Sequence, residues 1–463
     1  MKPSLLAALA FLPLPLLAQG GGARPTPTAQ PCLSPAAHAR VLDRVAEYAR
    51  ATPPTRKAAA RSIPTQLVNP VRLHPDAPLH HAYGISNFVD HDAAAEGNQY
   101  GATNRDYACG KRTYDLASGY NHSGTDYFAF PYPFWLMDND YVEVVAAAPG
   151  TLIGKDDGNF DRNCGSFEDE ADWNAVYVRH ADGSVAWYGH LKSGSLTTKG
   201  PGDAIEAGEF LGVMGSSGRS SDPHLHLEFR SDASANSTVV DPYAGDCNAT
   251  VDASAWATQE PQRASRVNAV FTHATAPQPF GCPTGLQDPR RQDAFEPGDV
   301  VYATCYLRDL RRGQPAQLTV TSPTGETVAS FRPSTDEDFN ASYWYVTVSL
   351  TDASPRGDYV VRATHGTDVV EHVFTNGTVS SAPDARGAPA VTLGPNPAAA
   401  TLTLRHAPAE STVRLYDVHG RTVLHAPATA AALPVGHLPR GTYVAHVSDV
   451  DGRPLLRERV LLF

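Results

Sequence analysis

The middle of the chain carries short apolar and aromatic runs, each broken after a few residues by glycine, proline or aspartate. Such short runs with regular breaks are typical of strands in a compact antiparallel β domain. Asp182-Gly183 between two runs predicts a hairpin turn, because this turn needs a positive φ that glycine adopts freely. The runs within 114–243 are 142–147, 175–178, 185–188, 210–214 and 225–229.

The length of the chain, 463 residues, is too great for one ordinary hydrophobic core. At about 150 residues per domain it suggests roughly three modules. The runs predict a mostly β chain with a compact antiparallel β-sheet domain, an immunoglobulin-like β-sandwich and a small C-terminal β-sandwich. The expected parts are a signal peptide over 1–18, an N-terminal region over 19–110 with one helix that is a candidate propeptide, the first β domain over 111–250, the immunoglobulin-like sandwich over 262–378, a linker over 379–389 and the last sandwich over 390–463.

The first residues have the pattern of a secretory signal peptide. The charged Lys2 precedes an apolar run over 5–17 and the small residue Ala18. No other stretch approaches the roughly 18 continuous apolar residues that cross a bilayer as a helix. We therefore expect an exported protein with no integral membrane segment after signal removal.

The charge balance excludes one class of partner. The chain carries 49 acidic and 37 basic residues, which gives a formal net charge of -12. Nucleic-acid binding depends on clustered lysine and arginine that neutralise phosphate. We therefore expect no nucleic-acid partner.

The cysteines are even in number, which in an exported chain favours disulfides over free thiols. Their spacing lacks the close pairs of structural zinc sites, so zinc held by these cysteines is the weaker interpretation. We expect a Cys282–Cys305 bridge within one late module, and a Cys109–Cys164 bridge that tethers loops of the first β domain. The six cysteines are Cys32, Cys109, Cys164, Cys247, Cys282 and Cys305.

Two short motifs place histidine and carboxylate groups where strands would bring them together. In the segment 223–228, His224 and His226 stand at i and i+2 and share one face of a strand. The same periodicity places His122 and Asp126, at i and i+4, on a common face. A catalytic zinc takes three protein ligands and keeps a fourth position for water. Two histidines and one carboxylate suit Zn2+ best, so His122, Asp126 and His226 are the candidate metal ligands.

Two further histidines remain available for catalysis. The predicted hairpin would deliver His190 at the end of its second strand, and His224 is not needed as a ligand. Zinc makes water a nucleophile near neutral pH and polarises a peptide carbonyl. His190 and His224 are therefore the candidate catalytic residues, as general base and as stabiliser of the oxyanion. The set predicts a peptide-bond hydrolase.

These motifs resemble those of the lysostaphin-type (LytM-like) zinc metalloendopeptidases. The matching segments, all within 114–243, are His-x-Gly-x-Asp at 122–126, Tyr-x-His-Leu at 188–191, and Gly-x-Ser-Gly-x-Ser at 215–220 followed by Pro-His-Leu-His-Leu-Glu. The resemblance implies that His122, Asp126 and His226 hold zinc. It implies that His190 and His224 serve catalysis, and that the substrate is a peptidoglycan cross-bridge or a glycine-rich peptide.

Two insertions depart from that family pattern. One spans 128–141 and is rich in proline and aromatic residues, and the other, acidic and cysteine-bearing, spans 156–173. We expect both insertions to reshape the substrate groove. The choice between substrates therefore stays open at this point.

The end of the chain resembles the sorting domains of type IX secretion. The matching segments within 390–463 are Leu-Gly-Pro-Asn-Pro at 393–397, Val-Arg-Leu-Tyr-Asp at 413–417 and Leu-Pro-Arg-Gly-Thr-Tyr at 438–443. The resemblance implies a small β-sandwich that brings its cargo to the type IX secretion machinery. It implies a secreted protein at the cell surface or in the extracellular space.

Two other functions stay open. An extracellular protein-degrading metalloprotease would keep the same chemistry with another substrate. A non-catalytic cell-wall or surface binding protein would need neither His190 nor His224. The segments 80–81 and 90–92 also carry histidine and aspartate, and they either cap the zinc or form plain loops.

Overall fold

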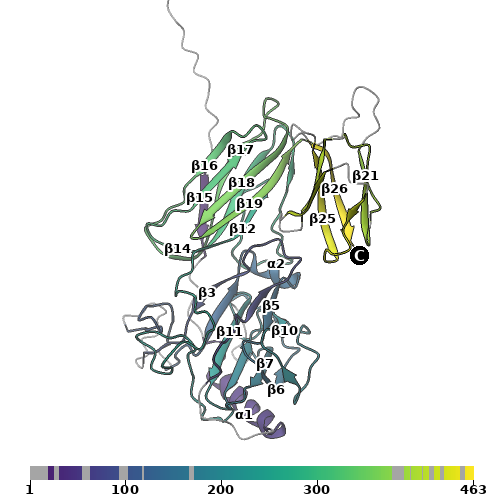
Figure 1. Cartoon of the computed structure of the whole chain (residues 1–463). Coiled ribbons are helices and arrows are strands. Elements are labelled where there is room, and N and C mark those ends of the chain that lie inside the picture. Colours follow the sequence, from purple (N-terminus) through teal and green to yellow (C-terminus); the bar gives the residue numbers. More distant parts are fainter. Residues whose placement is uncertain are drawn as a thin grey trace, which may run out of the picture.

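The structure is a computed structural model of the chain (Figure 1). It describes residues 19–24, 31–54, 63–92, 103–116, 119–165, 171–377, 391–396, 398–408, 410–416, 422–427, 432–448 and 454–462. Within these ranges the protein is mostly β, which confirms the predicted fold class. The expected signal peptide and linker lie outside the described residues. Among the described helices, none combines the length and the apolar character needed to cross a membrane.

The first β domain is built on a seven-stranded antiparallel sheet with the order β3-β4-β11-β8-β7-β6-β9, called the peptidase sheet below after the family that its motifs resemble. A three-stranded sheet of order β10-β5-β2 shares its hydrophobic core. The predicted hairpin is present, since β7 pairs with β8 and Gly183 has a φ of 95°. The bounds are β2 (Val71–Leu73), β3 (Tyr83–Asn87), β4 (Thr125–Ala129), β5 (Val142–Val145), β6 (Gly150–Asp156), β7 (Ala175–Arg179), β8 (Val185–Gly189), β9 (Ala204–Ile205), β10 (Phe210–Val213) and β11 (His224–Arg230).

The immunoglobulin-like sandwich consists of a four-stranded sheet of order β1-β17-β14-β12 and a five-stranded sheet of order β13-β19-β18-β15-β16. Strand β1 comes from the start of the described chain and pairs antiparallel with β17. The bounds are β1 (Gln19–Ala23), β12 (Arg266–His273), β13 (Ala294–Phe295), β14 (Val300–Leu310), β15 (Gln317–Thr321), β16 (Thr327–Phe331), β17 (Phe339–Ser349), β18 (Gly357–His365) and β19 (Asp368–Asn376).

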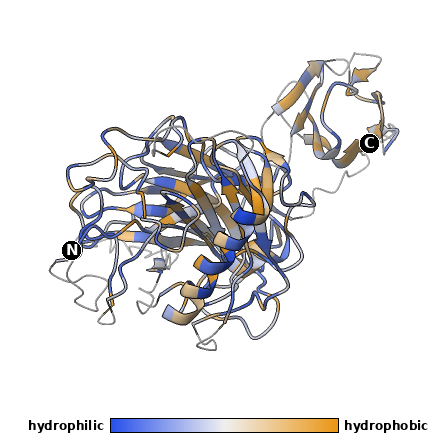
Figure 2. Ribbon diagram, turned by 90° about the horizontal axis from the view of Figure 1, so that it is seen from below, coloured by the Kyte–Doolittle hydropathy of each residue, from blue (hydrophilic) through white to orange (hydrophobic). Residues whose placement is uncertain are grey.

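The C-terminal β-sandwich has its own small hydrophobic core and lies apart from the rest of the molecule (Figure 2). Its sheets have the orders β20-β21-β24 and β23-β22-β25-β26. The bounds are β20 (Thr392–Gly394), β21 (Thr401–Arg405), β22 (Thr412–Tyr416), β23 (Thr422–Pro427), β24 (Leu433–Pro434), β25 (Gly441–Ser448) and β26 (Pro454–Leu462).

The peptidase sheet and the immunoglobulin-like sandwich pack directly on one another. The core of the first domain continues into buried residues of the sandwich. A buried ion pair joins Arg112 to Asp309 at 2.8 Å. The Asn268 side-chain amide donates to the backbone oxygens of Tyr83 and Phe130 at 3.1 and 3.2 Å. This contact places the sandwich beside the first strands of the sheet.

Helix α1 (Pro35–Ala51) lies within the N-terminal region for which the sequence predicts one helix. The Ser34 hydroxyl caps its start by accepting from the Ala37 N–H at 3.1 Å, and proline at the first helical position favours that start. Ala37, Val41 and Val45 form its buried face, four residues apart. They pack with Trp173 and other residues of the peptidase sheet region.

The disulfides differ from both expected pairings. Cys109 is bonded to Cys247, and Cys164 is bonded to Cys282. Cys32 and Cys305 are free and buried. The expected bridges are wrong because each prediction paired cysteines that are close in the sequence. The observed bridges join residues 138 and 118 positions apart, which the fold brings together.

Candidate metal centre

Three neighbouring strands of the peptidase sheet build the site. In the antiparallel pairing of β11 with β4, His226 lies opposite Asp126. In the pairing of β11 with β8, His226 lies opposite Gly189, and His190 follows directly after β8. Side chains opposite one another in a sheet are close enough to interact. The register therefore gathers carboxylate and imidazole groups around His226.

His224 and His226 share one face of β11, as predicted from their spacing. The corresponding argument for His122 is wrong, because β4 begins only at Thr125 and His122 lies in the preceding loop. Gly124 lets this loop approach β11, since a Cβ there would lie 2.6 Å from the Leu227 backbone oxygen. The loop, rather than a strand face, brings His122 to Asp126.

His226 lies at the centre of the cluster and is held from behind. Its Nε2–H donates to the buried Glu228 carboxylate at 3.2 Å, because a carboxylate can only accept. The Glu228 carboxylate also accepts from Arg230 Nε at 2.6 Å and from the Ser123 hydroxyl at 2.8 Å. The other ring nitrogen, Nδ1, lies 2.9 Å from Asp126 Oδ1.

His122 presents a nitrogen to the same carboxylate. Its Nδ1–H donates to the Phe88 backbone oxygen at 2.7 Å. Its Nε2 lies 3.0 Å from Asp126 Oδ2, but the angles make no hydrogen bond, and this fully buried nitrogen has no hydrogen-bond partner. An orphaned buried nitrogen aimed at a carboxylate is the arrangement that a bound cation would satisfy.

The local charges shift the pKa values of these three groups strongly. Burial alone lowers the pKa of His122, but the Asp126 carboxylate outweighs it and raises that pKa to about 10. Burial alone raises the pKa of Asp126, but His122 and His226 hold it well below its usual range. The pKa of His226 is raised well above its usual value, because nearby Cys32 and the carboxylates outweigh its burial. The pocket therefore favours positive charge next to Asp126.

The donor set fits zinc. His122, Asp126 and His226 offer two imidazole nitrogens and a carboxylate, and their donor atoms lie within 4.8 Å of one another. Each histidine uses its other nitrogen to donate to a protein oxygen, which is the usual outer support of a zinc ligand. These three residues would hold the ion.

The two candidate catalytic histidines lie together beside this donor set. The His190 and His224 rings are 4.3 Å apart between centroids. His190 has a left-handed φ of 64°, donates from Nδ1 to the Ser217 backbone oxygen at 2.6 Å, and has no hydrogen-bond partner at its buried Nε2. Burial lowers the pKa of His190, and His224 lowers it further. Neutral His190 can therefore accept a proton.

His224 is turned toward the same space by its neighbours. Its Nδ1–H donates to the Asp222 backbone oxygen at 2.9 Å, and its Nε2 lies 4.0 Å from Asp126 Oδ1. Tyr188 is not part of the site, because it is fully buried and its hydroxyl accepts from the Ala147 N–H at 2.8 Å.

The two insertions lie in different places. The first contains α2 (Pro133–Asp138), and its Tyr132 hydroxyl lies 3.0 Å from the Tyr306 hydroxyl of the sandwich. This insertion therefore docks the sandwich. The second ends at Trp173, whose ring lies 5.3 Å from His190 and 6.0 Å from His226 between centroids. The second insertion thus contacts the candidate site through Trp173, and the first insertion reaches it at Phe128, which pairs with His224.

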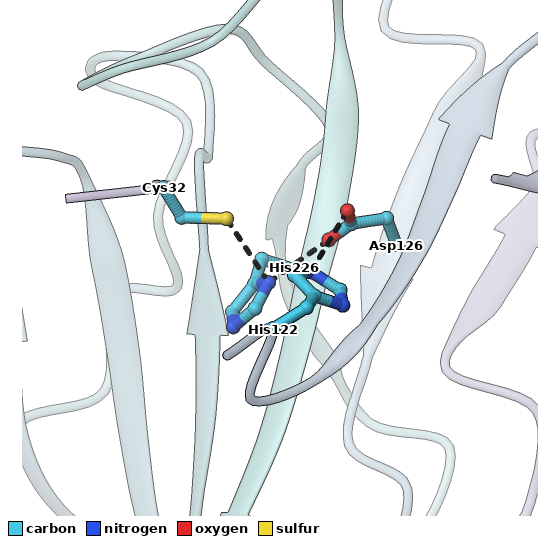
Figure 3. Close-up of side chains that lie close together, drawn as sticks. All are labelled: Cys32, His122, Asp126 and His226. Carbon is cyan, nitrogen blue, oxygen red and sulfur yellow. Dashed lines mark hydrogen bonds and ion pairs between the residues drawn. The ribbon is translucent and has the colours of Figure 1, made fainter. Parts of the chain in front are cut away.

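Sequence reasoning missed one member of the cluster. The Cys32 Sγ lies 3.4 Å from His226 Nδ1 (Figure 3). The even cysteine count favoured a disulfide for Cys32. The one local feature that could have suggested a fixed position for this thiol is the helix start that follows it. The segments 80–81 and 90–92 were the other candidates for capping the zinc, and their histidines contact other carboxylates. His81 Nε2 lies 3.0 Å from Asp368, and His91 Nε2 lies 2.8 Å from Asp241.

Comparison with known families identifies two parts of the chain. Residues 121–242 match the family model "Peptidase family M23", so the chain contains an M23 (LytM-type) peptidase domain. Residues 393–455 match the model "Secretion system C-terminal sorting domain". Both resemblances seen in the sequence are confirmed.

Individual relatives match only part of the chain. "DD-carboxypeptidase/endopeptidase Mpg" of Neisseria gonorrhoeae is 46% identical over 57 residues, which is 12% of this chain and 12% of that protein. "Peptidoglycan DD-endopeptidase ShyC" of Vibrio cholerae is 29% identical over 109 residues, or 23% of this chain and 20% of that protein. The matched region is thus a small share of either relative's length.

Among solved structures, the chain is similar to a mutant catalytic domain of the prophage-encoded M23 protein EnpA from Enterococcus faecalis. The two are 25% identical, and the match covers 34% of this chain and 90% of that domain, with a TM-score of 0.20.

Proposed function

We propose that this protein is a secreted zinc metalloendopeptidase that hydrolyses peptide bonds in peptidoglycan. The observation that carries the proposal is the convergence of the donor atoms of His122, Asp126 and His226 beside the paired rings of His190 and His224. A non-catalytic binding protein would need neither of the last two residues. Their buried, oriented rings therefore favour an enzyme.

Each residue has a distinct role in the proposed reaction. When bound, zinc supplies an activated water and polarises the scissile carbonyl. His190, kept neutral by burial, takes a proton from the attacking water at Nε2 and can return it to the leaving amine. His224 faces the same space and donates to the oxygen that gains negative charge.

Peptidoglycan is favoured as the substrate class because a matched relative is named a peptidoglycan DD-endopeptidase. Glycine-rich peptides and extracellular proteins are the competing substrates. The sorting domain supports export through type IX machinery to the cell surface or beyond. Deletion of residues 390–463 should then leave the protein inside the producing cell, as measured by fractionation.

A cleavage assay tests the proposed activity. The purified protein, loaded with zinc, is incubated with peptidoglycan and separately with a glycine-rich protein, and newly formed amino termini are counted. A His226→Ala variant and a chelator-treated sample serve as controls. Release from peptidoglycan that needs both zinc and His226 supports the proposal, whereas release that survives in either control contradicts it.

A further inference from the structure

We propose that the Cys32 thiolate is a fourth protein ligand of the metal in the full chain, and that the N-terminal segment thereby holds the site closed. The N-terminal segment here means the described residues 19–24 and 31–54. This inference rests on the proposed function for the identity of the other three ligands. It assigns a role to a residue outside the peptidase family match.

The position of the sulfur carries the first step. The Cys32 Sγ lies within 4.8 Å of the donor atoms of His122, Asp126 and His226. The sulfur also lies within 4.8 Å of nitrogens of His190 and His224. Figure 3 shows the thiol pointing at the ring of His226, opposite the Asp126 carboxylate. The sulfur therefore stands between the proposed ligands and the proposed catalytic pair.

A second observation is independent of the cysteine. The Nε2 atoms of His122 and His190 are buried and have no hydrogen-bond partner, and both residues are fully inaccessible to solvent. An unpartnered buried nitrogen is costly unless something binds it. A metal beside Asp126 would bind the nitrogen of His122, and that metal would lie within reach of the sulfur.

Charge balance favours the thiolate over a neutral fourth ligand. Zn2+ with the Asp126 carboxylate and two neutral histidines leaves one net positive charge in a fully buried site. The thiol loses its proton to solvent when it binds zinc, so the Cys32 thiolate cancels that charge. The four-ligand site is then neutral and tetrahedral, as closed zinc sites are.

The helix that follows Cys32 fixes the sulfur in place. Leu33 and the buried face of α1 pack on Trp173, Trp187 and Tyr177 around the peptidase sheet. Gly154 on β6 allows the close approach, because a Cβ there would lie 2.1 Å from the Tyr48 ring. This packing holds the backbone that carries the thiol against the site.

The second insertion supplies a polar clamp on the same helix. Arg44 lies 3.1 Å from the Asp156 carboxylate and 3.0 Å from the Asp172 carboxylate. Arg40 lies 3.1 Å from Asp172, and the Tyr48 hydroxyl donates to Asp156 at 2.8 Å. Single surface ion pairs contribute little, but this network connects the helix to the insertion at several points. The insertion thus holds the N-terminal segment rather than opening a groove.

The other described part of the segment contacts the site at a second place. The Arg24 guanidinium contacts the Asp222 carboxylate at 2.6 Å and lies 4.2 Å from the centre of the Phe128 ring. Asp222 also holds His224 through its backbone oxygen. The segment therefore contacts the site at two points, Asp222 and His226.

The consequence for activity follows from coordination chemistry. A catalytic zinc needs one position for water or substrate, and four protein ligands fill all four positions of a tetrahedral ion. Water and substrate must then displace the thiolate before a peptide can be cleaved. The full chain is inferred to be latent until Cys32 leaves the metal.

Cobalt substitution tests the assignment without relying on activity. The full chain is loaded with Co2+, and the near-ultraviolet thiolate-to-cobalt charge-transfer band is recorded. We expect the band in the wild type, its loss in Cys32→Ala and Cys32→Ser, and its retention in Cys305→Ala, which removes the other buried free thiol. A wild type that binds Co2+ without the band, or a band that persists in both Cys32 variants, overturns the assignment.

Two added measurements keep the result clear. Circular dichroism of each variant checks that it is folded. The charge-transfer band of the wild type tests the assignment even if a variant does not fold. Hydrolysis of peptidoglycan should be about tenfold or more faster in Cys32→Ala than in the wild type, because only the fraction of molecules in which Cys32 has left the metal can cleave substrate. Equal, measurable rates would overturn the blocking role.

The same data separate this inference from the proposed function. A wild-type band that Cys32→Ala abolishes, with no hydrolysis by any folded variant, would refute the proposed peptidase and leave the ligand assignment in place. Hydrolysis by a wild type that lacks the band would refute the ligand assignment and leave the peptidase in place.

Discussion

The peptidase sheet and the immunoglobulin-like sandwich each bury a free cysteine, and the two thiols have opposite properties. Burial raises the pKa of the Cys305 thiol in the sandwich to about 12. Burial acts in the same direction on Cys32, but the charge of His226 and the neighbouring His122 and His190 outweigh it, and the pKa of Cys32 lies well below the usual value. Neighbouring groups, rather than burial, decide whether a thiol can serve as a ligand.

Histidines in the two regions differ in the same way. His273 on β12 is buried, with Nε2 2.9 Å from the Tyr306 hydroxyl and Nδ1 3.3 Å from the Arg290 backbone oxygen, and burial lowers the pKa of His273 to about 4. His226 on β11 is equally buried but lies beside Asp126 and Glu228, and its pKa is raised. Carboxylates next to a buried histidine therefore make a cation site, whereas apolar and hydroxyl neighbours keep the ring neutral.

The largest effect should come from removing the central histidine of the metal centre. His226→Ala takes away a proposed ligand that contacts the metal directly. Loss of a residue that only supports a ligand costs up to about 100-fold in metal affinity, so zinc binding should weaken by more than about 100-fold. Isothermal titration with zinc measures the affinity. His273→Ala is the matched control and should bind zinc as the wild type does. Equal zinc affinities in the two variants would contradict the distinction between the two buried histidines.

Acid should destabilise the sandwich side through His273. Its folded pKa of about 4 lies below the unfolded value of 6.5, so the unfolded chain binds the proton more readily. The stabilisation is full above pH 6.5 and is lost as the pH falls toward 4, by about 3 kcal/mol at most. His273→Gln should reduce the difference in unfolding free energy between pH 7 and pH 4.5, measured with urea.

An exposed histidine provides the comparison for that measurement. His425 lies exposed on β23 of the C-terminal sandwich. His425→Gln makes the same substitution at an exposed position and is the matched control for His273→Gln. If His273→Gln and His425→Gln show the same pH dependence of unfolding, burial of His273 does not control acid stability.

Removing the carboxylate behind His226 should have a smaller effect on the metal. Glu228→Gln keeps the shape but loses the charge that orients the His226 ring, so zinc affinity should fall by about tenfold. Zinc titration measures the change. Glu371→Gln, at an exposed ion pair with Arg362 in the sandwich, should leave zinc affinity unchanged. A wild-type zinc affinity in Glu228→Gln would show that the carboxylate does not support the metal.

The smallest effect should come from removing the Cys305 thiol, which is proposed to bind no metal. Cys305→Ala removes one buried sulfur from the sandwich core and should lower the free energy of unfolding by about 1 kcal/mol. Urea unfolding measures the loss, and zinc affinity should not change. A change in zinc affinity would mean that the two buried thiols are not independent.

Much of the candidate site was predictable from short-range patterns. The alternation that places His224 and His226 on one face is a property of any strand, and β11 has it. The hairpin turn at Gly183 follows from one glycine's freedom to adopt positive φ. The donor atoms of the candidate ligands His122, Asp126 and His226 lie together, although the strand argument for His122 was wrong.

The sequence by itself therefore determined the β class, the two recognisable domains and the candidate residues of the histidine and carboxylate cluster, because these depend on local periodicity and on short motifs. Only the tertiary structure decided where Cys32 lies and which cysteines pair. The contact between Cys32 and His226 joins residues 194 positions apart, and the disulfides close loops of similar length. Such contacts depend on how whole sheets and helix α1 pack together, and no local pattern in the chain encodes that packing.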